Sequence, residues 1–110
     1  MFETKIQFKG KERSVKFGIW AIGEIQNATE KATNQIAGFA YMLFFGLLMG
    51  EGLRKDFISG NGIEFDIFDC YDWIDEQENG VQSKEVERIT KLFEKATEIH
   101  IAQKTDSKKK

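Results

Sequence analysis

The stretch Ile-Ala-Gly-Phe-Ala-Tyr-Met-Leu-Phe-Phe-Gly-Leu-Leu-Met, residues 36–49, decides the fold because it carries no charge and is apolar almost throughout. Its large side chains would surround a helix axis instead of lining one stripe, which is typical of a helix buried on most sides. We therefore expect a central helix that the rest of the protein encloses.

Polar residues after this run indicate where the central helix ends. Charged side chains return between residues 51 and 56, and Ser59-Gly60-Asn61-Gly62 is the densest turn signal in the chain. The pattern predicts one long helix over about 35–56.

The same run leaves a membrane-associated protein as an alternative, with the apolar helix 36–49 lying in or across lipid. Glycines at 38, 46 and 50 could support helix contacts there. However, the run is about 21 Å long at 1.5 Å per residue, whereas the hydrocarbon core of a membrane is roughly 30 Å thick. The amphipathic segments on either side also need a core to cover, so we favour a soluble protein without a membrane.

Residues 2–17 show the two-residue alternation of a half-buried hairpin. Phe2, Thr4, Ile6 and Phe8 alternate with polar residues, and Val15 and Phe17 do so beyond a turn at 9–11. An isolated hairpin is only marginally stable in water, so this one must pack on the helices.

Helical spacing of apolar residues predicts three further helices, at about 19–31, 66–77 and 84–103. Ser83 is the expected N-cap of the last one. Residues 104–110 hold no large apolar side chain and are expected to form a disordered basic tail. The sequence thus predicts an α+β, mainly α fold: a hairpin and about four helices in one domain, 1–103.

Composition narrows the classes of function. A net charge of -2 gives no overall basic field, so a nucleic-acid partner is not expected. The start of the sequence lacks signal-peptide order, and one cysteine cannot form an internal disulfide. We expect a protein of the reducing cytoplasm.

No group of residues indicates catalysis, a metal or a cofactor. His100, the sole histidine, sits on an apolar helix face, and the acids beside Cys70 disfavour a reactive thiolate. Acids at 66, 69, 72 and 75 fan around a helix and cannot converge on one ion. They form either a solvated face or a docking surface for a basic partner. We expect a protein that is not an enzyme.

A helix that is apolar all round is hard to cover with one hairpin and three helices. The excess apolar surface predicts a protein client or a homo-oligomer. We expect client or self-association contacts from five residues of the central helix: Phe39, Leu43, Phe44, Leu47 and Leu48.

The order of these elements resembles the tail assembly chaperones of long-tailed (siphovirus-type) phages. The resemblance rests on the stretch 15–25 (VKFGIWAIGEI), the glycine-spaced apolar helix, Tyr71-Asp72-Trp73-Ile74-Asp75, and a last helix with Phe93 and a lysine tail. It implies a protein of the host cell cytoplasm that binds the tape measure protein, a hydrophobic helical client, and keeps it soluble during tail assembly.

Members of that family are often made in two lengths by ribosomal frameshifting. Lys108, Lys109 and Lys110 could be encoded by a slippery run of adenines, or they could be a solubilising tail. The sequence leaves both interpretations open, with the tail favoured.

Overall fold

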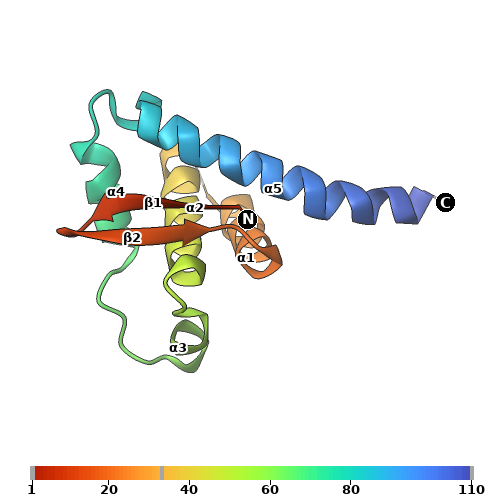
Figure 1. Ribbon diagram of the computed structural model, residues 1–110, viewed down its shortest axis with the longest axis horizontal. Helices are drawn as coiled ribbons and strands as arrows, with labels where there is room; N and C mark the ends of the chain where they lie inside the picture. Colours follow the sequence, from red (N-terminus) through yellow and green to blue (C-terminus); the bar gives the residue numbers. More distant parts are fainter. Residues whose placement is uncertain (1, 33, 110) are drawn as a thin grey trace.

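The computed structural model describes residues 2–32 and 34–109, with side chains up to His100. In this part of the chain two strands, β1 (Glu3–Phe8) and β2 (Lys11–Lys16), precede five α-helices (Figure 1). The helices are α1 (Ile19–Glu30), α2 (Gln35–Gly50), α3 (Arg54–Ser59), α4 (Ile67–Glu76) and α5 (Lys84–Lys109), and a 3-10 turn, η1 (Gly80–Gln82), precedes α5. The predicted α+β, mainly α fold is confirmed.

The hairpin places one apolar face on the helices. β1 and β2 are antiparallel, with Ile6 opposite Arg13 and Thr4 opposite Val15. The turn residues Lys9 and Gly10 both have positive φ, as a tight two-residue hairpin turn requires. Phe2, Ile6, Phe8, Val15 and Phe17 are buried, which is the alternation expected from the sequence.

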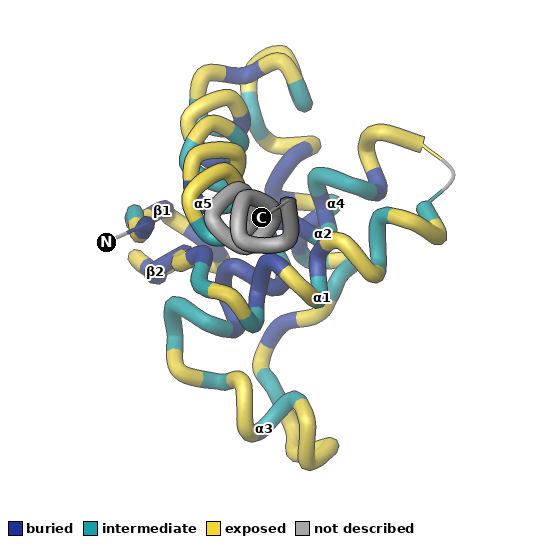
Figure 2. Tube along the Cα trace, turned by 90° about the vertical axis from the view of Figure 1, so that its right-hand side faces the viewer, coloured by how far each residue is buried: buried dark blue, intermediate teal, exposed yellow. Residues whose placement is uncertain are grey.

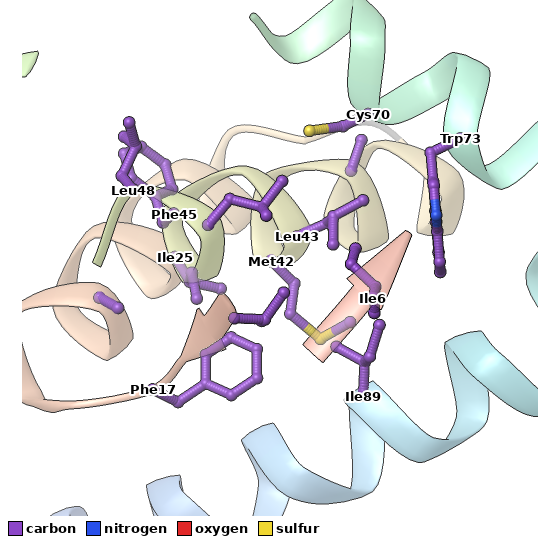
Figure 3. Close-up of a cluster of buried hydrophobic side chains, with 14 of the residues drawn as sticks. Ile6, Phe17, Ile25, Met42, Leu43, Phe45, Leu48, Cys70, Trp73 and Ile89 are labelled. Carbon is purple, nitrogen blue, oxygen red and sulfur yellow. The ribbon is translucent and has the colours of Figure 1, made fainter. Parts of the chain in front are cut away.

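Helix α2 is the centre of the fold. The hairpin, α1, α4 and α5 all contact it, and Figure 1 shows them arranged around it. Figure 2 shows buried residues gathered where these elements meet. In Figure 3, Met42, Leu43 and Phe45 of α2 lie among side chains from the hairpin, α1, α4 and α5.

The predicted helix over 35–56 is wrong beyond Gly50, because α2 ends there and a separate helix begins at Arg54. Gly52 adopts φ +72, its N–H donates to the Met49 carbonyl, and the N–H of Leu53 donates to the Leu48 carbonyl. This Schellman arrangement ends α2 at Gly50. α3 then begins at Arg54 and brings Phe57 back against Phe45, with ring centroids 5.7 Å apart.

Helix α5 begins as expected but continues further. The Ser83 hydroxyl accepts a hydrogen bond from the Val86 N–H at 3.1 Å, which is the predicted N-cap. The backbone stays helical to Lys109, past the expected end at 103 and through most of the segment predicted as a disordered tail. No glycine or proline lies between 84 and 109 to stop it. Lys110 lies outside the described residues.

Across residues 2–32 and 34–109, the structure contains no helix with both the length and the apolar character needed to cross a membrane.

Candidate docking groove

Three of the five predicted contact residues are taken up by the protein's own core. Leu43 is 2% exposed, and Leu47 and Leu48 are fully buried. These side chains belong to the cluster that α2 forms with the hairpin, α1 and α4. A client could not reach them in this conformation.

Phe44 lies in an aromatic cluster beside α3. Its ring is half-buried and makes edge contacts with Phe45, Phe57 and Phe65, at centroid distances of 5.3, 5.9 and 6.1 Å. The break between α2 and α3 makes this cluster possible because it folds Phe57 back. Phe44 is therefore mainly a packing residue.

The N-terminal half of α2 is the part that its neighbours cover least. Ile36, the second residue of the helix, is 47% exposed, and Phe39 is half-buried. Of the five predicted contact residues, Phe39 is the one that presents apolar surface to a groove, which is described next. The sequence did not single out Ile36 as a contact residue. Its position directly after the polar residues 33–35 could have done so, because it marks the N-terminus of the helix, where neighbouring elements bury the least surface.

A groove of about 470 Å³, here called the α1–α2–α5 groove, lies beside this half of α2. Its apolar lining comes from Ile25 on α1, Gly38, Phe39 and Met42 on α2, and Phe93 on α5. Ile25 and Met42 are buried and form the floor. Since its walls come from three helices, the groove forms only when these helices pack together.

Gly38 helps to keep the groove open. A Cβ at this position would lie 3.7 Å from the Thr29 methyl group, so a longer side chain would enter the space between α1 and α2. The polar wall is mostly neutral: Gln26, Thr29 and Asn34 contribute, and Glu94 is the charged residue of the lining. The groove therefore suits an apolar segment with little charge of its own.

Cys70 and His100, the side chains most able to take part in chemistry, are both packed into the fold. Burial, and after it the charges of Asp69 and Asp66, raises the pKa of the Cys70 thiol, which keeps it protonated. His100 packs edgewise on Phe2, with ring centroids 5.9 Å apart. Among the described residues, no three His, Cys, Asp or Glu side chains are placed to hold a metal ion.

Of the four acids at positions 66, 69, 72 and 75, two stabilise local structure. Asp66 and Asp69 form a capping box at the start of α4, each carboxylate accepting the other residue's backbone N–H, at 3.1 and 2.9 Å. Asp69 also pairs with Lys9 at 3.2 Å, which ties α4 to the hairpin turn. These two acids stabilise the fold.

Comparison with known proteins finds no matching family model, no matching curated protein and no matching solved structure. A functional assignment for this chain therefore depends on its own geometry and on the resemblance that its sequence carries.

Proposed function

We propose that this protein is a phage tail assembly chaperone that holds a hydrophobic helical segment of the tape measure protein in the α1–α2–α5 groove. One observation carries the proposal: the most apolar helix of the fold is left partly uncovered beside a groove of about 470 Å³ with an apolar floor. The family resemblance supplies the identity of the client.

The chemistry of the groove supports a helical client. Helix-in-groove binding places apolar side chains from one helix face into a hydrophobic groove, and the volume suits side chains from one face better than a whole helix. Phe39 and Phe93 offer aromatic walls, the residue type that often dominates binding energy at interfaces. The nearly neutral polar rim would allow contact with segments of varied sequence.

Co-expression with the tape measure protein tests the proposal. The unaltered chain should keep the client in the soluble fraction and co-purify with it, whereas Phe39→Asp should lose both effects because a carboxylate would be desolvated in the groove. Phe68→Asp is the matched control. Phe68 is 70% exposed on α4 and does not line the groove, so that variant should behave as the unaltered protein does.

A second variant separates loss of binding from loss of folding. Gln26 is exposed at the groove rim on α1, so Gln26→Trp adds bulk to the groove without removing a packed side chain. It should keep the helical circular dichroism spectrum and thermal midpoint, and should still fail to protect the client. Two results would refute the proposal. The first is a tape measure protein that is equally soluble without this chain, and the second is full protection of the client by the Phe39→Asp and Gln26→Trp variants while both remain folded.

A further inference from the structure

The negative charge of this protein is concentrated in one segment. Between Asp56 and Ser83 there is no Lys or Arg, although the chain as a whole is nearly balanced at -2. This segment holds eight acids: Asp56, Glu64, Asp66, Asp69, Asp72, Asp75, Glu76 and Glu78. The rest of the chain is consequently net positive, so the protein has a pronounced charge asymmetry.

Part of this charge is already compensated within the fold. Glu64 pairs with Arg13 at 2.5 Å and with Lys11 at 3.4 Å, and Asp69 pairs with Lys9. Asp72 and Asp75 differ from them, because within the part of the chain that the structure describes neither makes an ion pair or a side-chain hydrogen bond. Both carboxylates are exposed.

These two acids border a second apolar depression, here called the acidic hollow. It has a volume of about 370 Å³, lies between the start of α2, α4 and η1, and is lined by Ile36, Tyr71, Ile74 and Val81 together with Asp72 and Asp75. Ile36, 47% exposed, is its most open large apolar side chain. An exposed apolar surface with a charged border is the pattern of a protein-interaction site.

We infer that the acidic hollow docks a basic amphipathic helix from another protein. Apolar side chains of the partner would cover Ile36 and Val81. Its Lys or Arg side chains, one helical turn apart, would pair with Asp72 and Asp75, which are three residues apart on α4 and therefore also one turn apart. This surface is chemically unlike the nearly neutral α1–α2–α5 groove, so it serves a different partner or a different segment.

The two kinds of contact contribute differently. Exposed ion pairs are individually weak and are screened by salt, whereas the covered apolar surface supplies most of the affinity. The acids instead set the orientation of the partner and exclude acidic segments, as expected from electrostatic complementarity. Binding should accordingly weaken, without disappearing, as the salt concentration rises.

A designed peptide pair tests the inference on the full chain. The first peptide is a fluorescein-labelled helix with a leucine face bordered by lysines one turn apart, and the second has glutamate in place of every lysine. In fluorescence anisotropy the lysine peptide should bind and the glutamate peptide should not. The double variant Asp72→Asn, Asp75→Asn should weaken binding of the lysine peptide roughly three- to tenfold, the range expected for two exposed pairs.

Control variants locate the effect. Glu30→Gln with Glu98→Gln makes the same change in net charge at two exposed positions outside the hollow, and should leave affinity almost unchanged. Ile36→Ser should weaken binding by removing apolar surface, whereas Phe39→Asp, which alters the other groove, should not. This comparison separates the inference from the proposed chaperone function, because each can fail alone.

Three results would overturn the inference. The first is equal weakening by the two double variants, which would show a general charge effect. The second is loss of peptide binding in Phe39→Asp with full binding in Asp72→Asn, Asp75→Asn, which would place the peptide in the α1–α2–α5 groove. The third is a dimer in light scattering that only the Asp72→Asn, Asp75→Asn variant dissociates, which would identify a second copy of this chain as the occupant.

Discussion

Arg13 is a buried cation, 4% exposed, that joins the hairpin to the loop before α4. Its Nε donates to the Phe8 carbonyl at 2.9 Å, and its Nη1 pairs with the Glu64 carboxylate. The guanidinium carbon also lies 5.8 Å from the Phe8 ring centroid and 5.4 Å from that of Phe65. The sequence places Arg13 on a strand, but only the folded chain supplies all of these partners.

Replacing this cation should destabilise the protein. Arg13→Met keeps most of the side-chain volume but removes the hydrogen bonds and the cation–π contacts, and should lower the free energy of unfolding by about 1 to 3 kcal/mol. Lys11→Met is the control, because Lys11 pairs with the same Glu64 from an exposed position and should change stability by less than about 0.5 kcal/mol. Urea denaturation measures both, and equal effects would contradict this account of Arg13.

Glu64 should make part of the stability dependent on pH. Hydrogen bonds from Arg13 first, and then from Lys11, hold the pKa of this carboxyl below its ordinary value. Its contribution is therefore present above the unfolded-state pKa and is lost as the pH falls through the lower folded-state pKa. The difference in unfolding free energy between the unaltered protein and Glu64→Gln should shrink from neutral pH to below about pH 4. A difference that is constant over this range would refute the prediction.

At the scale of elements, α2 and the hairpin approach each other through glycines. A Cβ on Gly50 would lie 2.1 Å from the Ser14 carbonyl oxygen, and one on Gly46 would lie 2.7 Å from a Val15 methyl group. The carboxylate of Glu51 accepts the Ser14 N–H at 2.8 Å beside this contact. These glycines, which could also suit helix contacts in lipid, here allow a strand to lie against a helix.

Two glycine substitutions in helices should therefore have opposite effects. Gly50→Ala should cost about 2 to 4 kcal/mol of unfolding free energy, because the backbone of β2 must move away. Gly23→Ala, at an exposed position of α1 with nothing within 4 Å of the added Cβ, should stabilise by about 0.5 to 1 kcal/mol through helix propensity. Thermal unfolding of both variants checks the prediction, and destabilisation by Gly23→Ala would contradict it.

The break between α2 and α3 shows why element boundaries were harder to predict than elements. Charge and turn signals placed the helix end at about residue 56, before the turn that starts at Ser59, since Arg54 and Lys55 are acceptable in a helix. The chain ends α2 earlier because Gly52 can adopt positive φ at little cost and because the return of Phe57 covers Phe44 and Phe45. That gain exists only once the aromatic rings meet in space.

On the scale of the whole molecule, the buried side chains form one continuous cluster that includes the hairpin and α1, α2, α4 and α5. Trp73 on α4 is 5% exposed and donates its indole N–H to the Gln7 carbonyl of β1 at 2.8 Å. Trp20 on α1 lies edgewise against Phe45 of α2, with ring centroids 5.9 Å apart. The two tryptophans thus report on different sides of the same core.

This arrangement predicts one cooperative unfolding transition. Tryptophan fluorescence and far-ultraviolet circular dichroism should give the same urea midpoint, because small domains with a single core usually unfold without stable intermediates. Trp73→Phe tests whether the two sides are coupled. If Trp20 then reported a midpoint clearly different from that of the helix signal, the core would consist of two separable units.

By itself the sequence determined the fold class, the hairpin and the approximate positions of the helices, because alternation of apolar residues at two and at three to four positions is a local property of the chain. The uncharged run 36–49 likewise marked the central helix. It also indicated that this helix would be difficult to cover.

Only the tertiary structure decided which side of that helix is covered. Burial depends on which elements pack on each face, and periodicity within one helix holds no such information. The hairpin, α1 and α4 enclose Leu43, Leu47 and Leu48. Ile36 and Phe39 instead lie near the N-terminus of α2, where fewer elements pack on the helix. The groove and the acidic hollow are made by side chains distant in sequence, so they exist only after the helices have packed.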